Sequence, residues 1–157
     1  MSGQITTDHM IASRPEILAR LKAQLGRTGS IVAYNAGFEQ RILESCAGHF
    51  PEYATWYESI RGRLVDLLVP FREFHYYDPD QSGSASLKAV LPALTGRSYE
   101  GLEIADGQTA SRRFCDLAFG NLKETEKKAI RRALEVYCHQ DTDGMIDIIG
   151  ALKRSCH

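Results

Sequence analysis

The sequence has few cysteines, and none of them lies in a Cys-x-x-Cys pair. The four are spread along the chain, at Cys46, Cys115, Cys138 and Cys156. A zinc knuckle needs closely spaced ligands and a disulfide framework needs a cysteine-dense chain, so this spacing argues against both. We expect the thiols to be reduced.

Long apolar runs and an excess of charge are also missing. No stretch approaches the ~18 apolar residues of a membrane-spanning helix, and the N-terminus lacks the pattern of a signal peptide. We therefore expect no membrane contact and a cytoplasmic location. The formal net charge is -1 at pH 7. The chain as a whole thus has no electrostatic signature of nucleic-acid binding, although a local basic patch or a bound metal can supply one.

The residues that are present have the composition of a globular protein. The 157 residues are 43% hydrophobic and 25% charged, and a chain of this size can bury a core. Residues 1–12 show no sustained periodicity and are predicted to be a flexible N-terminal segment, whereas residues 13–157 are predicted to form a single domain. A helix over residues 13–26, a strand from Ser30 and a helix to about Gly48 give an αβα order, which is typical of a layered α/β domain.

The segment Ser30–Glu39 changes period from strand to helix at one point. Residues 30–34 form a short apolar run rich in β-branched residues, as in a buried strand, and Gly37 is predicted to mark the turn. Glu39 then lies in the first turn of a helix that begins at the carboxyl end of a strand, where ligands bind in open α/β sheets. An acid at this position is either a metal ligand or a favourable partner of the helix dipole.

Pro51 opens another predicted helix, which is rich in aromatic residues. Tyr53, Trp56 and Tyr57, followed by Ile60, form a stripe along it. The stripe is predicted to pack in the core, and the alternative is a platform on which bases stack.

Two polar residues further along are candidates for a site. Asp66 interrupts the apolar run 64–71, and a buried carboxylate is costly unless it is hydrogen-bonded, paired or metal-bound. It therefore either caps the next element or faces a site. Lys88 lies in the first turns of a helix capped by Ser84 or Ser86 and could contact a phosphate of the substrate; the alternative is a solvated lysine.

The C-terminal third is predicted to be helical. Thr109 is predicted to cap a helix that follows a turn at Asp106–Gly107. The segment Lys123–Arg132 holds five basic and two acidic residues and begins a long helical region. It is either a solvated face or a contact for a phosphate backbone.

Asp141 lies in the middle of the apolar face of that helical region. The face repeats at steps of three and four residues through Ile130, Leu134, Tyr137, Asp141, Met145, Ile148 and Leu152. A carboxylate on a buried face needs a partner, and Tyr137 is one turn before it on the same side. The pair is either a structural hydrogen bond at the edge of the core or a metal-bound acid beside a tyrosine that orients a water.

Two of these stretches resemble known motifs. Ala33–Glu39, Ala-Tyr-Asn-Ala-Gly-Phe-Glu, resembles the second motif of the DEDD exonucleases, which have a ribonuclease H-like fold. Tyr137–Asp141, Tyr-Cys-His-Gln-Asp, resembles their third motif in its Tyr-x-x-x-Asp form. More closely, the chain from about 29 to 152 is similar to a bacterial family near those exonucleases, the domain-of-unknown-function 2779 family. The segments that carry this similarity are 35–39, 65–68, 70–71, 84–92, 106–107 and 137–142.

The resemblance implies a helix-rich α/β domain with a partial ribonuclease H-like fold and few strands. It also implies hydrolysis of a phosphodiester by two divalent ions, Mg²⁺ or Mn²⁺, about 4 Å apart and held by carboxylates. Glu39 and Asp141 would be metal ligands and catalytic residues, Tyr137 would orient the attacking water, and Asn35 would shape the turn beside the substrate. The implied partner is a single-stranded nucleic acid. Family members often follow a nuclease-like or DNA-associated module, so such an upstream module is expected in the same polypeptide.

The sequence departs from the exonuclease motifs at two places. Glu39 stands where active exonucleases commonly have Asp, which moves the carboxylate by one methylene. The first motif, Asp-x-Glu on an earlier strand, has no counterpart between Met1 and Gly29. We therefore expect either the C-terminal part of a longer exonuclease-like domain or a degenerate relative, with little or no nuclease activity in this chain. The alternative function is a non-catalytic scaffold domain that binds nucleic acid or protein.

Overall fold

The computed structural model of the protein describes residues 14–155, in two compact units. The N-terminal unit extends to Pro70, and the C-terminal unit begins at Phe71. The flexible segment predicted for residues 1–12 and the predicted helix start at Ser13 lie outside the described residues. Most elements of these residues are helices, and the strands described form one two-stranded sheet in the first unit. The predicted class, α/β and rich in helices, is therefore confirmed. No helix within residues 14–155 combines the length and the hydropathy needed to cross a membrane.

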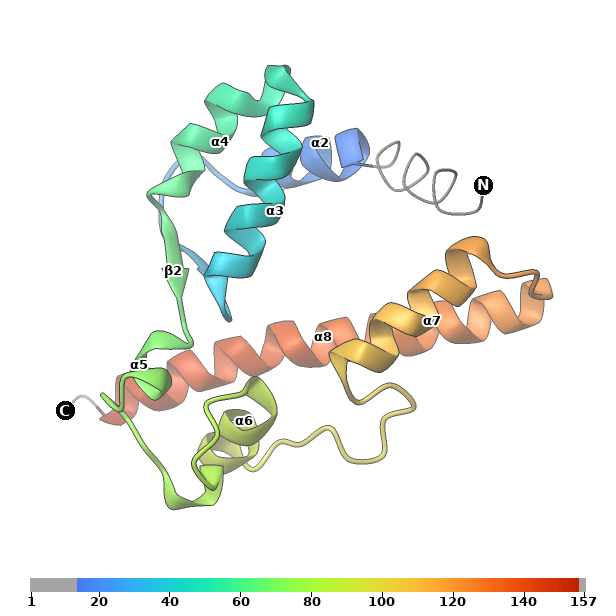
Figure 1. The fold of residues 1–157 in the computed structure, drawn as a ribbon. Helices are drawn as coiled ribbons and strands as arrows, with labels where there is room; N and C mark the ends of the chain where they lie inside the picture. Colours follow the sequence, from blue (N-terminus) through green and yellow to red (C-terminus); the bar gives the residue numbers. More distant parts are fainter. Residues whose placement is uncertain (1–13, 156–157) are drawn as a thin grey trace. The chain divides into compact units, whose positions relative to one another are not determined.

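The N-terminal unit contains two short parallel strands connected through helices (Figure 1). Its elements are α2 (Arg14–Gln24), β1 (Ile31–Ala33), α3 (Ala36–His49), the 3₁₀ turn η1 (Pro51–Tyr53), α4 (Ala54–Arg61) and β2 (Leu64–Asp66). In the sheet, Ile31 pairs with Leu64 and Ala33 pairs with Asp66. The carboxyl ends of β1 and β2 therefore lie at the same edge of the sheet.

The core of this unit lies where α3 and α4 meet. Ala47, Tyr57 and Ile60 form its buried centre. The partly buried side chains around them are Leu25, Ile31, Leu43 and Trp56. The predicted packing role of the aromatic stripe is therefore confirmed for Tyr57 and Ile60, whereas Trp56 is only half-buried.

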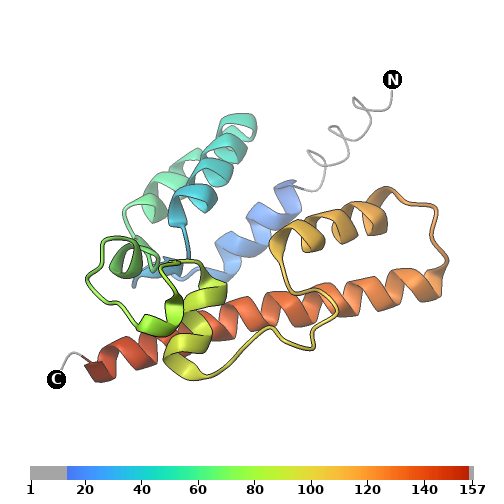
Figure 2. The same ribbon diagram turned by 60° about the horizontal axis from the view of Figure 1, so that its bottom comes forward.

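The long helix α8 (Glu124–Ser155) organises the C-terminal unit. The chain reaches it through α5 (Val69–Arg72), the 3₁₀ turn η2 (Pro79–Gln81), α6 (Leu87–Thr95) and α7 (Gly107–Phe119). Figures 1 and 2 both show α7 alongside the N-terminal half of α8 and α6 beside its C-terminal half. At Gly144 the approach of α6 is so close that an added Cβ would lie 2.7 Å from Cδ2 of Leu91.

Two predicted helix starts are wrong because local capping differs from expectation. Thr109 does not cap α7; the cap is Asp106. Its carboxylate accepts hydrogen bonds from the backbone N–H and the hydroxyl of Thr109, each with a length of 2.8 Å. Gly37 does not mark the turn after β1, because it lies inside α3. The turn is made by Asn35, with φ 66° and ψ 51°, a left-handed conformation that asparagine tolerates better than most residues.

Candidate functional site

Asp66 connects the two segments that leave the parallel strands. Its Oδ1 accepts hydrogen bonds from the backbone N–H of Asn35 over 2.8 Å and from that of Leu68 over 3.0 Å. One bond holds the turn after β1, and the other holds the turn after β2. Asp66 thus has two backbone donors, one of which holds the turn before α5. Its predicted place in a site stays a prediction.

Asn35 contributes a backbone conformation to this edge of the sheet. It is the N-cap residue of α3 and forms no side-chain capping bond, and its side chain is exposed. The preceding residue, Tyr34, is half-buried. Burial and the negative charge of Asp66 raise the pKa of the Tyr34 phenol, which therefore stays protonated at neutral pH.

Glu39 lies in the first turn of α3, as predicted. Its Oε2 atom is buried and accepts no hydrogen bond from any residue that the structure describes. Buried carboxylate oxygens almost always have a donor or a cation beside them, because removing them from water is costly. The helix N-terminus favours a negative charge here, but it supplies no donor to this oxygen. Glu39 therefore offers one buried ligand atom.

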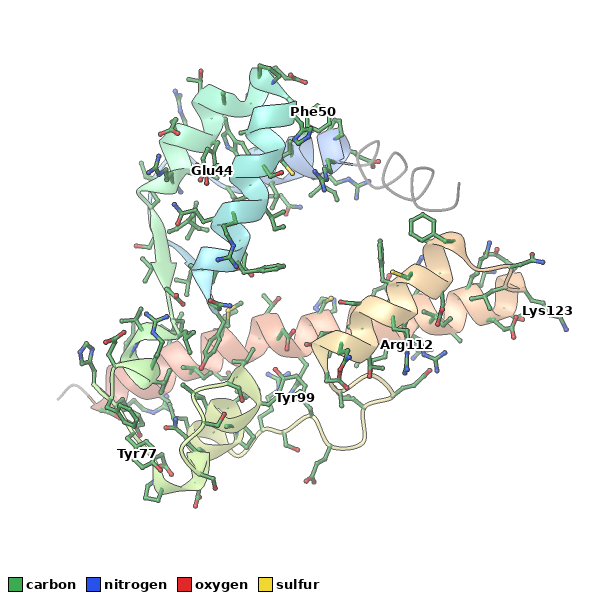
Figure 3. All side chains as sticks on the ribbon, in the orientation of Figure 1. Glu44, Phe50, Tyr77, Tyr99, Arg112 and Lys123 are labelled. Carbon is green, nitrogen blue, oxygen red and sulfur yellow. The ribbon has the colours of Figure 1, made fainter. Side chains whose placement is uncertain are left out.

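Asp141 lies on α8 beside two tyrosines. Tyr99 donates its hydroxyl to Oδ1 of Asp141 over 2.6 Å, and Figure 3 shows Tyr99 on the loop that runs beside α8. Tyr137 precedes Asp141 by one helical turn, and its ring centroid lies 6.1 Å from that of Tyr99. Burial, together with the charge and hydrogen bonding of Asp141, raises the pKa of Tyr137 to about 12. The same influences raise the pKa of Tyr99, so both phenols are neutral donors at pH 7.

Asp106, at the N-terminus of α7, brings a further carboxylate near Tyr137. A Cβ on Gly107 would lie 3.8 Å from the hydroxyl of Tyr137, so the neighbouring cap Asp106 is close to that phenol. Hydrogen bonds from Thr109 hold the pKa of Asp106 below its ordinary value, and the positive charge of Lys88 lowers it further. Lys88 is therefore close enough to influence the charge of Asp106, although Lys88 itself is exposed.

Two residues on the loop before α7, Tyr99 and Arg97, bond to side chains of α8, and the sequence did not predict them. Arg97 donates to Oε1 of Gln140 over 3.0 Å and to Oδ2 of Asp147 over 2.9 Å. Like Tyr99, it lies in a segment without periodicity, so no local pattern marks its role. For Asp106 a signal did exist, because an acid three residues before a threonine is a common start of a helix.

The predicted site residues are divided between the two units. Asn35, Glu39 and Asp66 belong to the N-terminal unit, and Tyr137 and Asp141 belong to the C-terminal unit. Within residues 14–155, no group of three or more His, Cys, Asp or Glu side chains is gathered so that it could hold a metal ion. A two-metal centre needs several carboxylates. Glu39 and Asp141 therefore do not make up such a centre by themselves.

Comparison with known proteins identifies a family. A family model described as "Domain of unknown function (DUF2779)" matches residues 2–86. The matched range contains Glu39 and Asp66, and it ends before Tyr137 and Asp141. No curated protein and no solved structure matches the chain.

Proposed function

The protein belongs to the DUF2779 family, and we propose that it carries part of a DEDD-type, metal-dependent 3′–5′ exonuclease-like site in a partial ribonuclease H-like fold. In this proposal Glu39 and Asp141 are ligands of Mg²⁺ or Mn²⁺, and Tyr137 is the residue that orients water. The ligand set is incomplete, because Met1–Gly29 contains no Asp-x-Glu. We therefore propose that this chain has little or no nuclease activity by itself.

The observation that carries the proposal is the buried Oε2 of Glu39, which has no donor among the described residues. A glutamate that only complements a helix dipole has no need to bury an oxygen. A carboxylate oxygen is also the hard donor that Mg²⁺ and Mn²⁺ prefer. A cation at Glu39 would satisfy this atom and explain why it is withdrawn from water.

The surroundings of Asp141 support the same proposal. Carboxylates that bind metals are commonly oriented by hydrogen bonds from neighbouring groups. The 2.6 Å bond from Tyr99 supplies such a contact at Oδ1 of Asp141. Tyr137 is neutral at pH 7 because its pKa is raised to about 12, so it can donate a hydrogen bond to a water.

Calorimetric titration of the chain with Mn²⁺ tests the assignment of ligands. We expect Glu39→Gln and Asp141→Asn each to weaken Mn²⁺ binding at least about tenfold, because each removes a charged ligand atom. Glu44→Gln and Glu135→Gln are matched controls, since both acids are exposed and lie on the same helices, α3 and α8. Equal affinity in all four variants, or no Mn²⁺ binding by the unmodified chain, would contradict the proposal.

A degradation assay tests the proposed lack of activity. The chain is incubated with single-stranded DNA or RNA in the presence of Mn²⁺, and we expect no products above those of a protein-free control. Rapid degradation that persists in Glu39→Gln would show that hydrolysis depends on other residues, and the assignment would then be wrong.

The alternative function is a non-catalytic scaffold that binds nucleic acid or protein through the basic segment 123–132. Its cations are Lys123, which Figure 3 labels, and Lys127, Lys128, Arg131 and Arg132. None of them forms an ion pair with another residue in the part of the chain that the structure describes. Binding of single-stranded DNA without metal, weakening steeply with salt and reduced in Lys128→Glu, would favour this function.

A further inference from the structure

The N-terminal unit contains a pocket that shares no residue with the proposed metal ligands. Its volume is about 410 Å³, and its wall includes Lys22, Arg27, Glu52, Trp56 and Arg63. Pockets that bind small molecules typically measure about 300–1,000 Å³. The size is therefore sufficient for one small ligand.

Arg63 gives this pocket a fixed rim. Its guanidinium donates to the backbone carbonyls of Gly26 over 2.7 Å, of Thr28 over 2.9 Å and of Gly29 over 2.7 Å. These bonds hold the loop between α2 and β1, where Gly29 has a φ of 88°. A rim that is held in this way needs little rearrangement when a ligand binds.

The other charged side chains of the pocket are not paired with one another. Lys22 lies 5.7 Å from the ring centroid of Tyr53. Across residues 14–155, neither Lys22 nor Arg27 nor Glu52 takes part in an ion pair. With Arg63 included, three positive groups and one negative group line the pocket, an excess of two positive charges. A phosphate monoester carries about -1.5 to -2 charges at pH 7, so it matches this excess, whereas an amino acid with no net charge does not.

Trp56 adds an aromatic surface to the same wall. It is half-buried, and its ring meets that of Tyr53 edge-on, with centroids 6.2 Å apart and an interplanar angle of 78°. Indole rings stack on nucleobases without regard to base identity. A phosphate, an aromatic ring and a hydroxyl that can donate to Glu52 occur together in a nucleotide.

We propose that this pocket binds a nucleoside 5′-monophosphate unit. Lys22 and Arg27 contact the phosphate, Trp56 contacts the base, and Glu52 accepts a hydrogen bond from a sugar hydroxyl. The unit is either a free mononucleotide or one nucleotide of a single strand. Arg63 shapes the pocket through the carbonyl bonds and contributes charge.

The tryptophan makes the test direct, because Trp56 is the single tryptophan of the chain. Its fluorescence is followed while adenosine 5′-monophosphate, a short oligoadenylate, adenosine or ribose 5-phosphate is added. We expect a saturable change with a phosphate-bearing nucleotide and at least about tenfold weaker binding of adenosine and of ribose 5-phosphate, because each lacks one of the two recognised groups.

Variants separate recognition from a general effect of charge. Arg27→Gln is expected to weaken binding about tenfold, because it removes a charge-assisted contact to phosphate. Arg41→Gln makes the same charge change at an exposed position of α3 outside the pocket, and it should leave the affinity unchanged. Calorimetry with Trp56→Phe should retain binding, whereas Trp56→Leu should weaken it. Circular dichroism verifies that each variant is folded.

The outcomes are distinct. Saturation by the free mononucleotide supports a metabolite site, and saturation by the oligoadenylate alone supports a site for a nucleic-acid strand. No saturable change with either ligand overturns the proposal, as does equal weakening by Arg27→Gln and Arg41→Gln. Because the pocket contains neither Glu39 nor Asp141, this result is independent of the metal titration.

Discussion

The close contact between α6 and α8 makes the substitution Gly144→Ala a sensitive test of the C-terminal unit. An alanine Cβ at this position would lie 2.7 Å from Cδ2 and 3.2 Å from Cδ1 of Leu91, a side chain that is 0% exposed. The methyl group and Leu91 cannot both keep their places, and Leu91 is fully buried. We therefore expect Gly144→Ala to destabilise the protein.

Two opposing effects set the magnitude. Alanine is favoured over glycine inside a helix by about 0.8–1.0 kcal/mol, whereas overpacking a buried contact costs about 1–3 kcal/mol. The net loss in the free energy of unfolding should therefore be up to about 2 kcal/mol. Gly150→Ala is the matched control on α8, because its Cβ would meet only Nη1 of Arg154 at 3.5 Å. It should stabilise the protein by about 0.5–1 kcal/mol.

Urea denaturation followed by far-UV circular dichroism measures these changes, and a double mutant identifies their cause. Leu91→Ala alone should cost about 2–5 kcal/mol. In that background the clash is gone, so Gly144→Ala should become stabilising, with a coupling energy of about 1–3 kcal/mol. If the two substitutions are additive to within about 0.5 kcal/mol, or if Gly144→Ala stabilises as much as Gly150→Ala, the packing argument is refuted.

Two further predictions concern polar groups. Arg63→Gln should lower the free energy of unfolding by about 1–3 kcal/mol in urea denaturation, because three carbonyls lose a charged donor. The control Arg61→Gln breaks only an exposed 3.6 Å pair with Glu58, so it should change the free energy of unfolding by less than about 0.5 kcal/mol. Similar effects of both substitutions would contradict the role given to Arg63. The pKa of Tyr137 is raised from 10.0 to about 12, so its contribution to stability is complete below pH 10 and is lost as the pH rises to about 12. The urea midpoint should therefore fall more between pH 8 and pH 11 for the unmodified chain than for Tyr137→Phe, and equal falls would show that this phenol does not titrate late.

Much of the N-terminal unit could be predicted because its signals are local. The change of period at Ser30–Glu39 predicts a strand, a turn and a helix, and the structure contains all three, with Glu39 in the first helical turn. The position of the turn was wrong by two residues, because a glycine was expected where Asn35 takes the left-handed conformation. That Asp66 is hydrogen-bonded was predictable in kind, since a carboxylate in an apolar run needs donors. Its partner Asn35 was not, because the two residues are 31 positions apart.

In the C-terminal unit, too, the local contacts of the candidate site could be predicted and the distant ones could not. The helical stripe places Tyr137 one turn before Asp141, and α8 confirms that spacing. Tyr99, which makes the 2.6 Å bond to Asp141, is 42 residues away in a loop. Only packing of that loop on α8 brings the two together.

The sequence by itself determined which segments become helices and strands and that Glu39 lies in a first helical turn, because these depend on side chains within one or two turns of each other. It also determined the family, because the family model matches residues 2–86 of the sequence. The tertiary structure alone decided which distant groups meet: Tyr99 with Asp141, Leu91 with Gly144, and the cations of α2 and its loop with Trp56. The physical reason is that such contacts depend on how whole elements pack, and packing joins residues that have no relation in the local pattern.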